Sequence, residues 1–177
     1  MFHWYALRVR SRCEKAVASF AQSKGFEQFL PQLVKRNLWS DRIKTVRLPL
    51  FAGYVFCRFD PSDRLPILAM PGVLHIVGLG KIPMAIEDSE INAIRTALQS
   101  DVVLEPCPYI DSGPRVQLLS GPLMGVEGYL IEAGRYQRMV VSVNLLQRSV
   151  ALEIDPSWMN HSEAPGLVGT FSEAPNL

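Results

Sequence analysis

The first hundred residues alternate between strand-like and helix-like hydrophobic patterns. From Trp4 to Arg10, apolar and polar side chains alternate along the chain, which predicts a half-exposed strand. Ser11 and Glu14 have the spacing of a helix capping box, and the apolar residues that follow recur at helical spacing until Gly25. The pattern therefore predicts a strand followed directly by an amphipathic helix.

The same alternation continues in an order that is typical of a layered domain. Further strands are predicted over residues 26–30, 33–39, 43–48, 53–59 and 73–77, with a turn at Ser40-Asp41 inside a basic hairpin. Helices are predicted to open at Asp60 and Asp88, the second with Ile91, Ile94 and Leu98 on one face. This order predicts an α+β fold over residues 1–100, a ferredoxin-like αβ sandwich with one antiparallel sheet covered by helices.

Glycines dominate the pattern in the second part of the chain. Gly113, Gly121, Gly125 and Gly128 fall within sixteen residues, around a short strand that runs into a Gly-Pro turn. Glycine accepts tight bends without steric cost, so this spacing favours a small five-stranded β-barrel over residues 113–160, with a generic hairpin as the alternative. Its strands are predicted over residues 115–119, 127–133, 138–143 and 149–154 and near Trp158.

Two stretches lack such periodicity. Residues 101–112 carry two prolines and predict a linker between the domains. Residues 161–177 contain two prolines and no Lys or Arg, and predict a disordered tail.

Composition narrows the class of protein. Hydrophobic residues make up 48% of 177 residues, which excludes a globally disordered chain. No stretch has the length and apolarity of a membrane span, and the N-terminus has no basic leader before an apolar core. The three cysteines are an odd number, which does not fit a disulfide framework. We therefore expect a cytoplasmic protein that does not bind membranes.

The charge is unevenly distributed. Residues 1–50 carry ten Lys and Arg against three Asp and Glu, whereas the rest of the chain carries eight against fourteen. The first part is therefore +7 and the second −6, although the whole chain is only +1. Such asymmetry indicates a basic face near the N-terminus that meets a phosphate backbone.

Several motifs together resemble the NusG family of transcription factors. Trp4 to Leu7 resembles the first strand of that family, Leu48 to Phe56 its most recognisable segment, and Pro71 to Val73 the next motif. Gly113 to Leu130 resembles the KOW motif, and Arg138 to Arg148 continues it. The resemblance covers residues 3–159 and implies a NusG N-terminal domain followed by a KOW domain.

One position departs from the family pattern. Ala52 stands where the family usually has proline, which loosens the turn before Gly53. The opening segment and the hairpin around Arg42 resemble specialised RfaH-like and UpxY-like antiterminators more than the housekeeping factor. The choice between the housekeeping factor and a specialised paralogue stays open.

The resemblance implies a role for each group of residues. The clamp of the RNA polymerase beta-prime subunit is expected to bind Phe51, Tyr54, Phe56 and Arg8, with only part of the aromatic set exposed. The non-template DNA strand of the transcription bubble is expected to contact Arg10, Arg12 and Lys15. The KOW tip, with Leu145, Leu146 and Arg148, is expected to recruit the small-subunit ribosomal protein NusE or the Rho factor.

The resulting hypothesis is a transcription elongation and antitermination factor that suppresses pausing and needs no cofactor. No residue set resembles a catalytic centre, because His3, His75 and His161 are far apart and Cys57 lies in an apolar strand. We therefore expect no enzyme and no metal site. The alternatives are a KOW-containing ribosome-associated protein and a plain RNA-binding module.

Overall fold

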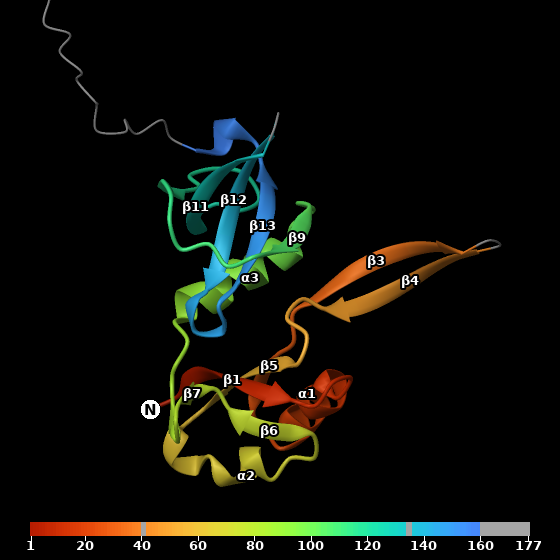
Figure 1. Cartoon of the computed structure of the whole chain (residues 1–177), viewed down its shortest axis with the longest axis vertical. Helices are drawn as coiled ribbons and strands as arrows, with labels where there is room; N and C mark the ends of the chain where they lie inside the picture. The colour runs from red at the N-terminus through yellow and green to blue at the C-terminus, as the bar shows by residue number, and fades with distance from the viewer. Residues whose placement is uncertain (40–41, 134–135, 160–177) are drawn as a thin grey trace, which may run out of the picture.

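The computed structural model describes residues 1–39, 42–133 and 136–159, and Figure 1 shows its two parts. The predicted tail and the predicted Ser40-Asp41 turn lie outside these residues. No helix in the described part of the chain has the length and apolarity needed to cross a bilayer.

The N-terminal part is built on a four-stranded antiparallel sheet with the order β2-β5-β1-β6. This topology confirms the ferredoxin-like prediction, since the first and third core strands lie side by side at the centre. Its elements are β1 (His3–Val9), α1 (Glu14–Ser23), β2 (Glu27–Phe29), β3 (Gln32–Trp39), β4 (Arg42–Pro49), β5 (Tyr54–Phe59), η1 (Pro61–Asp63), α2 (Leu65–Leu68), β6 (Val73–Ile76), β7 (Gly78–Leu79), β8 (Ile82–Pro83) and α3 (Asp88–Gln99).

The two faces of this sheet pack against different helices. One face presents Leu7, Val55 and Phe59, which pack with the buried residues of α1 and α2. The other face presents Trp4 and Phe56, which share an apolar cluster with α3. Alternation of side chains along β1 and β5 produces this division, because successive residues of a strand point to opposite faces.

The C-terminal part is a five-stranded antiparallel sheet with the order β10-β11-β12-β13-β9. It is closed where Leu118 bridges Met159 and where the backbone N–H of Leu119 donates to the carbonyl of Trp158 at 2.8 Å. Its elements are β9 (Leu104–Cys107), β10 (Arg115–Gln117), β11 (Glu127–Ala133), β12 (Tyr136–Val143), η2 (Asn144–Leu146), β13 (Arg148–Ile154) and η3 (Pro156–Trp158).

The predicted linker over residues 101–112 was wrong in part, because Leu104–Cys107 forms strand β9 and pairs antiparallel with β13. The brief strand predicted near Trp158 is present only as the single bridge between Leu118 and Met159, which follows the 3-10 helix η3. The sequence of β9 contains Pro106, which lowers its strand signal, but β9 lies at the sheet edge where proline is tolerated. Residues from 104 onward therefore belong to the barrel.

The predicted capping box at the start of α1 was also wrong. Cys13 occupies the N-cap position, and no side chain caps the helix. The carboxylate of Glu14 points inward and accepts a hydrogen bond from the backbone N–H of Gly53. Glu14 therefore bonds to the turn at Gly53, which is distant in sequence, and does not cap its own helix as the spacing had predicted.

The hairpin β3–β4 projects away from the body of the molecule (Figure 1). Its strands are paired in register from Gln32 with Pro49 to Trp39 with Arg42, as the pattern predicted. A two-stranded ribbon of this kind leaves both faces open near its base, where Val34 and Leu48 are exposed.

Candidate functional site

The aromatic residues expected to bind a partner lie largely inside the molecule. Phe56 is fully buried and Phe51 is 5% exposed, while Tyr54 is half-buried. The ring of Phe51 meets Phe56 edge-on at a centroid distance of 5.9 Å, and Phe29 stacks on Phe56 at 6.1 Å. In this arrangement, only Tyr54 of the predicted set retains an accessible ring.

Arg8 and Tyr54 are brought together by the pairing of β1 with β5. They are register partners, and the guanidinium of Arg8 lies 4.8 Å from the centre of the Tyr54 ring. A cation over an aromatic face is an attractive arrangement. The two residues were predicted to act on the same partner, and the sheet places them side by side.

The turn before β5 is held from two sides. Gly53 has a φ of +82°, a left-handed conformation that residues with a Cβ rarely adopt, and a Cβ at that position would clash with the Arg8 guanidinium. The backbone N–H of Gly53 donates to Glu14 at 2.8 Å. Arg8 and Glu14 thus fix the loop that carries Phe51 and leads into Tyr54.

The residues that were predicted to bind nucleic acid come shortly after Arg8 in the sequence. Arg10, Arg12 and Lys15 are exposed, and they run from the end of β1 to the first turn of α1. Arg12 adopts a left-handed backbone conformation with a φ of +66°. The connection therefore forms an exposed cationic stretch beside the Arg8–Tyr54 pair.

Helix α3 lies between the N-terminal sheet and the barrel (Figure 1). Toward the sheet, the guanidinium of Arg95 lies 5.5 Å from the Trp4 ring and 5.2 Å from the Phe29 ring. The buried Ile91 and Ile94 belong to an apolar cluster that continues into the barrel. The sequence pattern predicted a single apolar face for α3 and gave no sign of its contact with the barrel.

The KOW tip contacts the N-terminal part in this structure. η2 forms a short 3-10 turn in which Leu146 is 7% exposed, Leu145 is half-buried and packed against the shared cluster, and Arg148 follows as an exposed residue. The side chain of Asn144 donates to Glu90 of α3 at 2.7 Å. Neither leucine is fully exposed to solvent in this arrangement.

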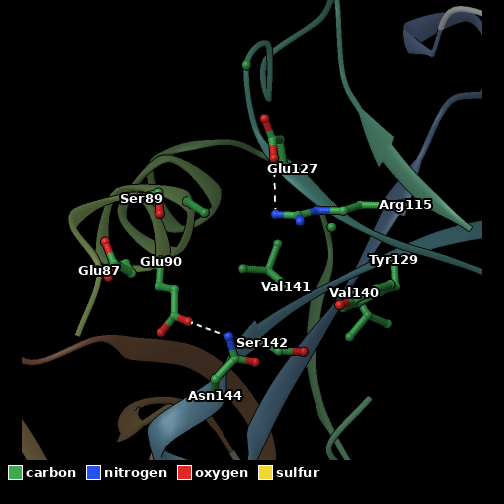
Figure 2. Close-up of a pocket in the computed structure, with 13 residues that line it drawn as sticks. Glu87, Ser89, Glu90, Arg115, Glu127, Tyr129, Val140, Val141, Ser142 and Asn144 are labelled. Carbon is green, nitrogen blue, oxygen red and sulfur yellow. Dashed lines mark hydrogen bonds and ion pairs between the residues drawn. The ribbon is translucent and has the colours of Figure 1, made fainter. Parts of the chain in front are cut away.

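A pocket of about 330 Å³ separates α3 from the barrel strands, and Figure 2 shows the residues that line it. Burial raises the pKa of Glu90, with Glu87 adding to that rise, although the hydrogen bond from Asn144 acts against it. Arg115 pairs with Glu127 at 3.3 Å on the opposite wall. Within the described residues, no three His, Cys, Asp or Glu side chains converge as a metal site.

Comparison with known proteins identifies the family. The model of a family described as transcription termination factor nusG matches residues 2–95, more than half of the chain. The chain belongs to the NusG family. This confirms the resemblance that the motifs between Trp4 and Val73 had indicated.

Relatives in this family cover almost the whole chain. The transcription termination/antitermination protein NusG of Helicobacter pylori is 22% identical over 170 residues, which cover 87% of this chain and 95% of the relative. The protein of the same name from Campylobacter jejuni is 23% identical over 163 residues, covering 85% and 92%. The chain is thus similar to NusG factors over both domains.

A solved structure of the family shows the same fold. The structure described as domain interaction in Thermotoga maritima NusG has a TM-score of 0.52 at 18% identity, and the match covers 92% of this chain and 98% of the other. As a NusG-family member, the chain combines an α+β N-terminal domain with a KOW-type five-stranded sheet. The Arg8–Tyr54 pair, the cationic stretch and the KOW tip are its candidate functional surfaces.

Proposed function

We propose that this NusG-family chain is a transcription elongation and antitermination factor that binds the RNA polymerase clamp with its N-terminal domain. The observation that carries the proposal is the position of Arg8 over Tyr54 beside the exposed Arg10. An aromatic anchor with an adjoining cationic surface suits a site where protein and nucleic acid meet. The names of the relatives, transcription termination/antitermination proteins, support the same function.

Tyr54 is the ring that meets the beta-prime clamp in this proposal. It keeps accessible surface, and Arg8 holds its orientation. Phe51 and Phe56 are buried and pack against each other, in the apolar cluster against which Tyr54 packs. A partner gains the full aromatic surface only when α3 and the barrel withdraw from the shared cluster.

Arg10, Arg12 and Lys15 contact the non-template strand of the transcription bubble. Their exposure leaves each charge free to approach a phosphate. Contacts of this type release counterions, so they supply affinity that falls as salt rises. Together with the clamp contact, they would hold polymerase in a form that resists pausing.

The KOW tip recruits the second partner, the small-subunit ribosomal protein NusE or Rho. The tip combines the apolar side chains of Leu145 and Leu146 with the positive charge of Arg148. An apolar surface with a polar rim is typical of a small protein-binding site. Because Leu146 is buried and Leu145 packs against the cluster shared with α3, the tip must leave α3 before both leucines can bind a partner.

Co-purification of the tagged full chain from cell lysate tests the proposal. We expect RNA polymerase among the captured proteins, and a Tyr54→Ala variant should lose it while Phe2→Ala, an exposed aromatic outside the site, should keep it. Capture of ribosomes without polymerase would instead favour a ribosome-associated protein. Capture of bare RNA alone would favour a plain RNA-binding module.

A further inference from the structure

The Arg8–Tyr54 pair continues onto a third strand of the N-terminal sheet. β6 lies at the edge of the sheet beside β1, and His75 of β6 is the register partner of Arg8. Arg8 is in turn the register partner of Tyr54 on β5. Directly opposed residues of paired strands share a face, with Cβ atoms about 5 Å apart. Tyr54, Arg8 and His75 therefore form a row across three strands, called the surface row below.

A β-bulge in β6 places His75 in the surface row. The register between β1 and β6 shifts by one residue between Arg8 and Val9, so that Leu74 is the extra residue of β6. Without this shift, Leu74 would lie opposite Arg8 and His75 would point to the other face of the sheet. Bulges are common beside functional sites, where they re-aim a side chain. Here the bulge brings an imidazole next to a guanidinium.

The burial of the neighbouring residues agrees with this arrangement. Val73 and Ile76 both pack into the apolar cluster that α1 and α2 cover. They are three residues apart, and in a regular strand such residues would point to opposite faces. The bulge lets both reach the core, while His75 remains exposed on the face of Arg8.

The surface row offers positive charge and hydrogen-bond donors that have no acidic partner within the protein. Arg8 is half-buried, and every ion pair in the described part of the chain is made by groups other than Arg8 and His75. A guanidinium has five N–H donors, and an imidazole has one when neutral and two when charged. A carboxylate is the side chain that satisfies a guanidinium best, because its two oxygens can accept in parallel.

Apolar side chains border the charged centre of the surface row. At one end, Tyr54 packs against the cluster that contains Phe51 and Phe56. At the other end, Leu74 is an exposed hydrophobic residue of β6. Tyr and Arg are enriched at interfaces between proteins. A protein segment that carries both a carboxylate and apolar side chains matches this arrangement better than a phosphate backbone does.

We propose that His75 is a third contact residue of the clamp surface. Together with Arg8 it binds an Asp or Glu side chain of the polymerase, next to the contact that Tyr54 makes. The inference rests on the proposed function, because it names the chemistry of the partner at that same surface. Its new content is the role of β6 and its bulge, which the aromatic segment alone does not indicate.

Binding of the full chain to purified RNA polymerase core enzyme without nucleic acid tests the proposal. His75→Glu should weaken binding about tenfold or more, since it places a carboxylate against the acidic group of the partner. His75→Leu should weaken it about fivefold, because one hydrogen bond is lost. His75→Lys keeps a positive charge and should bind within about twofold of the parent. Unchanged binding of His75→Glu, or a Lys variant as weak as the Glu variant, overturns the proposal.

His3 supplies the matched control. It is an exposed histidine of the same sheet, and it pairs in register with Phe59, whose side chain lies on the opposite face. His3→Glu makes the same change of charge as His75→Glu and should leave polymerase binding unchanged. Circular dichroism establishes that each variant is folded. An equal loss of binding in the two folded variants overturns the proposal, because the effect would then come from net charge alone.

Photo-cross-linking identifies the group that faces His75 without relying on affinity. A photoreactive phenylalanine analogue is introduced at position 75, and at position 3 as the control, and each full chain is bound to polymerase on a transcription bubble. We expect position 75 to cross-link to a polymerase segment that contains Asp or Glu, and position 3 not to cross-link there. A cross-link from position 75 to nucleic acid, or to a segment without an acidic residue, overturns the proposal.

Tyr54→Ala in the same binding assay separates this inference from the proposed function. If Tyr54→Ala loses polymerase and His75→Glu keeps it, the role of His75 fails and the proposed function stands. If the parent chain itself does not bind polymerase, both fail.

Discussion

The carboxylate of Glu14 accepts a hydrogen bond from the backbone N–H of Gly53 at 2.8 Å, across a separation of 39 residues. Glu14 is 6% exposed, so this bond forms away from solvent. It links the first turn of α1 to the loop that carries Phe51 and leads into Tyr54. The position of the candidate clamp surface therefore depends on a residue of α1 that does not itself belong to that surface.

We predict that Glu14→Ala destabilises the protein by about 1–3 kcal/mol, because it leaves a buried backbone donor without its partner. Urea unfolding followed by circular dichroism measures the change. Glu27→Ala removes a carboxylate whose ion pairs are exposed to solvent, and it should cost about 1 kcal/mol or less. Equal losses for the two variants would show that the Gly53 bond has no special role.

Tyr54 and Phe56 should respond differently to truncation, although they lie on one face of β5. Tyr54→Ala should lower polymerase affinity about thirtyfold, the value of roughly 2 kcal/mol for an interface anchor, with little change in stability. Phe56→Ala should cost about 3–5 kcal/mol of unfolding free energy, because Phe56 is fully buried. Binding assays and thermal unfolding on both variants check this. A folded Tyr54→Ala protein with unchanged affinity would place the clamp contact elsewhere.

Reversal of the cationic stretch should affect nucleic acid and not protein. A double Arg10→Glu and Arg12→Glu variant should bind a transcription bubble assembled on polymerase more weakly than the parent, with the largest difference at low salt. Its binding to polymerase without nucleic acid should stay the same. Titration of both complexes over a range of salt concentrations makes the comparison, and an equal loss in the two would mean that these arginines contact protein.

The contact between Glu90 and Asn144 should depend on pH. Burial raises the pKa of Glu90 above its ordinary 4.5, and the nearby Glu87 adds to the rise, while Arg115 across the pocket is already paired with Glu127. Burial in the contact therefore disfavours the ionised form of Glu90, compared with Glu90 in water. The contact is fully stable below the ordinary pKa and weakens as pH rises through the raised one.

Glu90→Gln tests this dependence, because it keeps an acceptor for Asn144 and removes the ionisation. We expect the variant to strengthen the contact between α3 and the barrel at neutral pH and to abolish its pH dependence. Amide chemical shifts of α3 and η2, followed against pH by NMR, report the contact. A variant that loosens the contact at neutral pH would contradict the assignment.

Leu145 and Leu146 of the KOW tip should differ in role, one in partner binding and one in stability, as Tyr54 and Phe56 do. Leu146→Ser should destabilise the barrel by about 2–5 kcal/mol, since Leu146 is 7% exposed. Leu145→Ser should leave the barrel folded and weaken binding of NusE or Rho. Two-dimensional NMR titration of each variant with either protein checks this, and unchanged binding of the Leu145→Ser variant would move the recruitment surface to another face.

The strands and the order of elements followed from the sequence, because they depend on local pattern. Alternation along β1 and β5 placed Phe56 on a different face from Val55, and the structure bears this out. The hairpin β3–β4 and the glycine-rich strands of the barrel followed in the same way. The motifs around Trp4 and Phe51 were sufficient to indicate the family, whose model matches residues 2–95.

Tertiary structure decided everything that depends on a distant partner. Glu14 had the spacing of a local cap, yet burial against the β4–β5 turn gave it the N–H of Gly53 as a stronger alternative. Leu104–Cys107 had little strand signal, but the open edge of β13 supplied the hydrogen bonds that made it a strand. Leu146 is buried in an apolar cluster that joins the barrel to α3, and no local pattern encodes which residues meet in that cluster. A sequence fixes which face of an element is apolar, whereas only the assembled chain fixes what covers that face.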